Sequence, residues 1–281
     1  MKNTIFKKYN VIGDDLYYHH TESEPTRESY YLGPETHLQY EVLYLLSGEV
    51  SYIIEGESYD VRRGDMIFVA PKEIHTLKVE GDMPYERAVL LFNMDILHRL
   101  MRELEVKLGI FGKNEENPFH IIKSDKVKEY GLDRIMMSII EEEGEENRKK
   151  LNIMSKLIRF IVSIDRARAE NTSPEPASRD KLVLDVAEYV NSHIHEPIRL
   201  EDIAKELFIS VSTLCHSFSS LMNMTVNKYV ITKKIHLAND FLHKGYSARA
   251  AAEAVGYDNY TSFFYNYKRI MGTPPTAYDK S

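Results

Sequence analysis

The chain has 281 residues, enough for two domains of ordinary size, and 43% of them are hydrophobic and 28% charged. Its apolar runs are shorter than the roughly 20 residues that a membrane span needs, and its single cysteine excludes an internal disulfide framework, so we expect a cytoplasmic protein without a membrane partner. The net charge of -7 excludes a strongly basic nucleic-acid binder, so that any case for DNA binding has to come from pattern.

Short strand-like segments follow one another through residues 27–92. Apolar runs in this region are separated by turn signals at Gly48, Gly56 and Gly64. Short strands divided by regular turn residues are typical of a β-sandwich or a small barrel. We therefore predict an antiparallel β-domain at residues 1–92.

Apolar residues take a helical spacing after residue 92. They recur every three or four positions in Asp95–Leu108, Asp133–Glu142 and Leu151–Arg166. The charged segment Glu141–Lys150 is expected to be a solvated turn, which makes residues 93–166 a helical hairpin region. The apolar stripe of the last helix either packs on the β-domain or forms a dimer surface. Its members are Ile153, Met154, Leu157, Ile158, Ile161 and Ile164.

Residues 167–180 have the composition of a linker between domains. They are polar, contain two prolines and lack a large apolar side chain. The charge balance also changes here, because residues 1–178 carry 24 Lys and Arg against 32 Asp and Glu, whereas residues 179–281 carry 12 against 11. We predict a separate, all-helical domain at residues 181–281.

The C-terminal domain contains an internal repeat, which is a structural signal in its own right. The offset between matching residues is 48 before a turn and 49 after it, as a duplicated helix-turn-helix with one extra turn residue would require. The pairs at 48 are Ala204 with Ala252, Leu207 with Val255, and Ile209 with Tyr257; the pairs at 49 are Leu214 with Phe263, Phe218 with Tyr267, Met222 with Met271, and Tyr229 with Tyr278.

Each copy of the repeat has the local signals of two helices joined by a turn. In the first copy, Phe208 and Ile209 form the turn and Ser210 caps the next helix. In the second copy, Gly256 suits a turn position with positive φ. The other expected features are a cap at Ser247, a cap at Asp258, and a helix over Thr225–Leu242 that joins the two copies.

Residues 198–278 resemble the AraC/XylS-type DNA-binding domain. The resemblance lies in the segments LEDIAKELFISVSTL and AAAEAVGYDNYTSFFYNYKRIMG and in the closing TPPTAY. It implies two helices that each enter the major groove of double-stranded DNA. By position in this pattern, the DNA-contacting candidates are Ser212, Thr213, Cys215, His216, Tyr260, Thr261, Phe264, Tyr265, Asn266, Lys268 and Arg269.

The sequence departs from the usual family pattern at two of these positions. Many relatives have an arginine where His216 and Tyr265 stand here, and an arginine paired with guanine is the commonest specific base contact. We therefore expect hydroxyl and apolar contacts with the bases, and an A·T-rich operator. The candidates for phosphate contacts are Lys228, Lys233, Lys234, Lys268 and Arg269.

The β-domain resembles the cupin-like sensor domains that precede such DNA-binding domains. The supporting residues are His37-x-x-x-Glu41, the stretch LLSGEVSYIIEGESYDVRRGDMIFVAP, and Pro71-x-x-x-His75. Cupin enzymes bind a metal through three histidines and a glutamate, and the second histidine has no counterpart here. Three of the ligands remain, so a divalent ion stays an alternative, but we favour a site without metal or cofactor, in which an organic effector meets polar walls. The effector-binding candidates are His37, Glu41, Tyr44 and His75, with Tyr52 and Phe68 as nearby aromatics.

These observations predict a ligand-responsive transcription regulator and not an enzyme. The expected partners are DNA, a small-molecule effector that is a sugar or a related metabolite, RNA polymerase and a second copy of the chain. The family resemblance implies activation of transcription. The alternatives are a cupin metalloenzyme with a helical accessory domain, and a DNA-binding protein whose barrel only dimerises.

Overall fold

The computed structural model describes residues 4–12, 16–23, 29–80, 83–93, 98, 101–103, 105, 108, 119–170 and 175–276. The chain divides into two compact units, residues 1–178 and residues 179–281. None of the helices in these described ranges is both long and apolar enough to cross a membrane.

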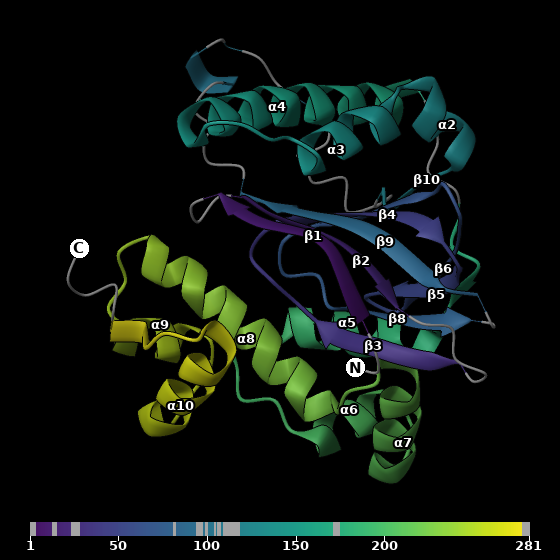
Figure 1. The fold of residues 1–281 in the computed structure, drawn as a ribbon. Helices are drawn as coiled ribbons and strands as arrows, with labels where there is room; N and C mark the ends of the chain where they lie inside the picture. Colours follow the sequence, from purple (N-terminus) through teal and green to yellow (C-terminus); the bar gives the residue numbers. More distant parts are fainter. Residues whose placement is uncertain are drawn as a thin grey trace. The chain divides into compact units, whose positions relative to one another are not determined.

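The first unit contains two antiparallel β-sheets, as predicted for the β-domain (Figure 1). The six-stranded sheet has the order β1 (Thr4–Ile12), β2 (Leu16–Ser23), β9 (Tyr85–Phe92), β4 (Tyr40–Ser47), β7 (Met66–Val69), β10 (Ile121–Ile122). The five-stranded sheet has the order β11 (Ser178–Arg179), β6 (Glu57–Arg62), β5 (Glu49–Ile54), β8 (His75–Glu80), β3 (Tyr30–Glu35).

The six-stranded sheet contributes to two different cores, because successive side chains of a strand point to opposite faces. On β4, Leu43 and Leu45 face the five-stranded sheet, whereas Val42 faces a layer of helices. On β9, Val89 likewise faces the other sheet and Leu90 the helices. The register of this sheet therefore decides which residues can line a space between the two sheets.

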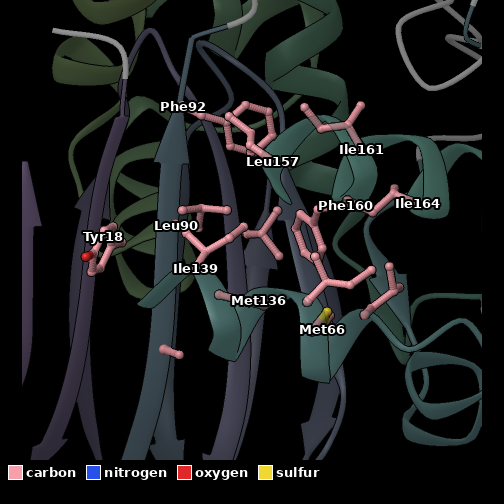
Figure 2. Packing of buried hydrophobic residues seen from close by; sticks show 14 of the residues in the cluster. Tyr18, Met66, Leu90, Phe92, Met136, Ile139, Leu157, Phe160, Ile161 and Ile164 are labelled. Atoms are coloured by element: carbon pink, nitrogen blue, oxygen red, sulfur yellow. The ribbon is translucent and has the colours of Figure 1, made fainter. Parts of the chain in front are cut away.

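Three helices, α2 (Ser124–Glu129), α3 (Leu132–Ile140) and α4 (Glu146–Glu170), lie between β10 and β11 in the chain. Figure 2 shows side chains of α3 and α4, such as Ile139 and Phe160, packed against Leu90 and Met66 of the sheet. The apolar stripe of the last predicted helix thus packs within the chain: Ile153, Leu157, Ile161 and Ile164 are all buried there.

Two of the sequence-based boundaries are wrong, and a third predicted element lies mostly outside the described residues. The charged turn is shorter than predicted, because α4 already begins at Glu146 and its first turns are rich in helix-forming Glu, Arg and Lys. The predicted linker begins too early, since α4 continues to Glu170 with Ala167 buried, and Ala177 N–H donates to Ser58 O near the linker's other end. The helix predicted over Asp95–Leu108 lies mostly outside the described residues.

From Lys181 onward, the described part of the second unit is all-helical (Figure 1). The long helix α8 packs against α7 on one side of the repeat and against α9 and α10 on the other. It therefore joins the two copies, as predicted. The helices are α5 (Lys181–Ser192), α6 (Leu200–Glu206), α7 (Val211–Met222), α8 (Val226–His243), α9 (Ala248–Ala254) and α10 (Tyr260–Met271).

The repeat found in the sequence is present in the backbone hydrogen bonds. Ile209 N–H donates to Ala204 O over 2.9 Å, and Tyr257 N–H donates to Ala252 O over 3.0 Å, 48 residues later. Beyond the turns the offset is 49, since α7 begins at 211 and α10 at 260. The paired core residues Leu214 with Phe263 and Phe218 with Tyr267 are fully buried, whereas Tyr278 lies outside the described residues.

Candidate functional site

A cavity of about 300 Å³ lies between the two sheets of the first unit. This volume is at the lower end of the range for small-molecule sites and suits a compact ligand. Strands of both sheets supply its walls, which mix apolar, aromatic and charged side chains. The lining residues are Tyr17, His19, Thr21, Leu32, Glu35, His37, Glu41, Leu43, Tyr52, His75, Thr76, Leu77, Arg87, Val89 and Leu91.

At one end of the cavity, three of the predicted effector-binding residues come together. His37 Nε2 lies 3.0 Å from Glu41 Oε2, and His75 Nε2 lies 3.8 Å from the same oxygen. The hydroxyl of Tyr52 donates to Glu41 Oε1 over 2.9 Å. The sequence therefore identified a real cluster, although its residues come from β4, β5, β8 and the segment before β4.

The charge of this cluster is set by its neighbours. Burial alone would raise the pKa of Glu41, but the hydrogen bond with His37 and the charge of His75 outweigh it and hold the pKa at about 2. Burial likewise opposes a charge on His37, yet the bond to Glu41 leaves the pKa of His37 raised. The cluster thus carries a firmly ionised carboxylate inside a largely apolar wall.

A second polar group on β2 and β9 was missed by the sequence reasoning. Arg87 lies over the ring of Tyr85, with 4.6 Å from Cζ to the ring centroid, and its buried Nη1 has no hydrogen-bond partner among the described residues. Burial, with a contribution from Arg87, lowers the pKa of nearby His19 to about 4, so this ring is neutral. Arg87 thus supplies a cation to a cavity whose other end holds the ionised carboxylate of Glu41.

Two aromatic candidates lie on the wrong face of their strands. Tyr44, expected among the effector ligands, packs with the helix-facing cluster, because it is three residues from Glu41 on the same strand. Phe68 faces the same way and contacts Phe119. The sequence reasoning missed Tyr17 and His19, which are alternate residues of β2 and both line the cavity. That alternation in Leu16–Ser23 was the available signal.

The first candidate reading helix, α7, presents a small polar surface at its N-terminus. Ser210 caps it by accepting from Thr213 N–H over 3.0 Å, as predicted. Ser212, Thr213 and His216 are exposed, and Cys215 is half-buried. Exposed residues in the first turns of such a helix are those that can reach base edges in a major groove.

The second candidate reading helix, α10, presents a more aromatic surface. Its cap is Asn259, which accepts from Ser262 N–H over 3.1 Å, and not Asp258 as predicted. Thr261 is exposed and Tyr265 is 67% exposed. The rest of the predicted set divides into half-buried Tyr260, Phe264 and Asn266 and exposed Lys268 and Arg269. Asn266 contacts both Tyr257 and Arg269 through its amide, so its side chain is held on the helix surface.

One predicted phosphate contact is wrong. Lys234 is only 5% exposed, and its ammonium donates to the carbonyls of Val255, over 2.7 Å, and of Glu196. Burial lowers its pKa to about 8. It therefore fastens the turn of the second copy to the loop before α6. Lys228 is exposed and Lys233 is half-buried over the ring of Tyr229, so both stay candidates for phosphate contacts.

Two protein-family models match the chain, one for each unit. Residues 21–155 match the AraC-like ligand binding domain, and residues 203–281 match a helix-turn-helix domain. The chain belongs to the AraC family of transcription regulators. Its AraC-type architecture was predicted correctly from the sequence, including the ligand-binding β-domain and the DNA-binding helical domain.

Curated relatives of this AraC-type regulator include the Msm operon regulatory protein of Streptococcus mutans, which is 22% identical over 98% of this chain and 96% of its own length. An uncharacterized regulator of Bacillus subtilis, YbfI, is 22% identical over 79% of this chain and 78% of its own length. Among solved structures, an apo form of a ToxT variant from Vibrio cholerae aligns with a TM-score of 0.42 and 14% identity, over 97% of this chain and 98% of its own. The names of the two curated relatives describe an operon regulatory protein and a transcriptional regulator of the helix-turn-helix type.

Proposed function

We propose that this regulator activates transcription in response to a small hydroxylated metabolite, a sugar or a related compound, bound in the cavity between the two sheets. The observation that carries the proposal is the composition of the cavity wall. Tyr52 supplies an aromatic face, Glu41 supplies acceptors, and Arg87 supplies donors. A polyhydroxyl compound needs such a mixture, because its hydroxyls both donate and accept while its carbon faces pack on aromatic rings.

The DNA-binding side of the proposal rests on the exposed surfaces of α7 and α10. Ser212, His216 and Thr261 would bond base edges, and Tyr265 would contact thymine methyl groups, which favours an A·T-rich operator. Lys268 and Arg269 would contact phosphates. We further propose that the regulator acts in the cytoplasm, as a homodimer, together with RNA polymerase. The buried stripe of α4 is already used within the chain, so a dimer contact needs other residues.

Three experiments test this function. Genome-wide mapping of DNA bound by the chain would identify its operators, and A·T-rich sites that tolerate single guanine substitutions are expected. A screen of sugars, polyols and sugar acids for an increase in Tm of the purified chain would then find the effector. Transcription in vitro from a mapped promoter should rise when this effector is added. A fall would overturn activation, and the lack of a Tm shift with every compound class would overturn the effector proposal.

A further inference from the structure

His37, Glu41 and His75 form a compact cluster of side chains in the wall of the cavity. The three side chains offer ligand atoms that all lie within 4.8 Å of one another. Their side chains are 15%, 8% and 4% exposed. The cluster is therefore a compact group of two imidazoles around one buried carboxylate, directed into the cavity.

The hydrogen bonds of the two Nδ1 atoms, which point away from Glu41, determine the tautomers of both rings. His37 Nδ1 lies 2.8 Å from Gln39 O, and His75 Nδ1 lies 3.1 Å from Glu73 O. A carbonyl oxygen only accepts hydrogen bonds, so each Nδ1 carries the proton. In a neutral ring the Nε2 atom is then an acceptor. Both Nε2 atoms face Glu41, which as a carboxylate also only accepts.

When both rings are neutral, this arrangement leaves three acceptors directed at one place. His75 Nε2 has no hydrogen-bond partner in the described part of the chain, at 3.8 Å from Glu41 Oε2. Such a set is satisfied by a proton on each ring or by a cation between the three atoms. Histidines that bind metals characteristically donate their other ring N–H to a backbone carbonyl or a carboxylate, as both rings do here.

The carboxylate is also held in place. Tyr52 donates to Glu41 Oε1, which leaves Oε2 turned toward the two imidazoles. The ring of Tyr52 stacks on that of His75, with centroids 5.9 Å apart and planes at 14°. One tyrosine therefore orients two of the three ligand groups.

We propose that His37, Glu41 and His75 bind one divalent transition-metal ion through two Nε2 atoms and one carboxylate oxygen. Ligand atoms at about 2.0–2.2 Å from an ion lie roughly 3.0–3.5 Å from each other. The two separations from Glu41 Oε2 are 3.0 and 3.8 Å and all three ligand atoms lie within 4.8 Å, so the imidazoles have to draw closer together to bind one ion. Imidazole with carboxylate suits zinc, iron, nickel or manganese better than calcium. The remaining coordination positions face the cavity, where an oxygen of the effector can bind; this last step alone rests on the proposed function.

Metal retention by the full-length chain tests the site directly. The chain is stripped with a chelator, dialysed against Zn²⁺ or Co²⁺, and its bound metal is measured by mass spectrometry and, for Co²⁺, by visible absorption. One ion per chain is expected for the wild type. Glu41→Gln and His75→Gln should lower the affinity at least 100-fold, and Tyr52→Phe about 10-fold, as the loss of an orienting partner does.

Matched controls come from the same cavity. His19→Gln and Glu35→Gln remove a histidine and a carboxylate that line the cavity but lie outside the cluster, and both should retain the ion. Retention by Glu41→Gln equal to that of the wild type, or no retention by the wild type, overturns the proposal. If circular dichroism shows that Glu41→Gln does not fold, the metal affinity of Tyr52→Phe is the deciding measurement, and an affinity equal to that of the wild type overturns the proposal. The effector screen is repeated on the metal-free chain. Metal retention without any Tm shift would contradict only the effector proposal, whereas a Tm shift without metal retention would contradict only the metal site.

Discussion

Phe208 and Gly256 occupy the same position in the two copies of the helix-turn-helix repeat. They are 48 residues apart, and both have a left-handed backbone, with φ of 55° and 68°. The turns around them share two backbone hydrogen bonds, one from this residue and one from the residue after it. Their surroundings differ, because Phe208 is 96% exposed, whereas a Cβ on Gly256 would lie 2.4 Å from the carbonyl carbon of Glu196.

This difference predicts opposite effects of substitution. Gly256→Ala should lower the free energy of unfolding of the second unit by about 2–4 kcal/mol, because a left-handed alanine costs about 1 kcal/mol and the new methyl displaces the backbone of Glu196. Phe208→Gly should be neutral or stabilise by up to about 1 kcal/mol, since it removes the strain without losing packing. Hydrogen exchange of amides in α6–α7 and α9–α10 of the full chain measures both. Equal losses for the two variants would contradict the assignment.

We predict that burial of Lys234 makes the free energy of unfolding depend on pH. Its pKa of about 8 in the folded chain is below the ordinary value of 10.5, so between these values the unfolded chain binds more protons. The folded state therefore gains stability as the pH rises through this window, by up to about 3 kcal/mol. Lys234→Met cannot titrate, and it leaves the carbonyls of Glu196 and Val255 without their donor.

The measurement compares urea unfolding of the wild type and of Lys234→Met at pH 7.5 and pH 9.5. The variant should be less stable by about 1–3 kcal/mol at the lower pH, and its deficit should grow at the higher pH. Lys228→Met is the control, because this exposed lysine lies on the same helix. A deficit that is independent of pH would show that Lys234 is not a buried titrating group.

Local signals predicted the helical unit well and the cavity only in part. Caps such as Ser210, the left-handed Gly256 and the 48-residue offset are properties of neighbouring residues, so they can be read without a fold. The inward face of a strand is different, because it depends on register across the sheet. Tyr44 was assigned to the cavity by its closeness in sequence to Glu41, but three residues along a strand reverse the face.

The residues that sequence reasoning missed or assigned wrongly are those whose role depends on distant partners. Arg87 on β9 and Thr21 on β2 are directly opposite each other in the sheet, 66 positions apart in the sequence. Lys234 looks like an exposed lysine of a basic helix until Glu196 and Val255 are seen to face it. Neither the contact between β2 and β9 nor that of Lys234 with the two carbonyls can be predicted from composition or periodicity.

We predict that the affinity for the effector depends on Arg87, a cavity residue that the sequence reasoning missed. The compound with the largest Tm shift in the screen should bind Arg87→Gln about 10- to 100-fold more weakly, because a hydrogen bond to a charged group contributes about 1.5–3 kcal/mol. Tyr44→Phe should bind it as the wild type does, since this side chain faces the helices. Calorimetric titration of both variants measures the two affinities. Weaker binding by Tyr44→Phe and unchanged binding by Arg87→Gln would place the effector outside this cavity.

Lys268 predicts a change in the salt dependence of DNA binding. Its side chain is exposed on α10, one turn beyond Phe264 and Tyr265, where a helix inserted in the major groove passes the phosphate backbone. If Lys268 neutralises one phosphate, Lys268→Ala should weaken binding to specific and unrelated DNA alike, and should reduce the slope of log affinity against log salt by about 1. Fluorescence anisotropy with a mapped operator at several salt concentrations gives this slope. Lys150→Ala removes the same charge from an exposed residue of α4 and should leave the slope unchanged, so that an equal change in both variants would reveal only the effect of net charge.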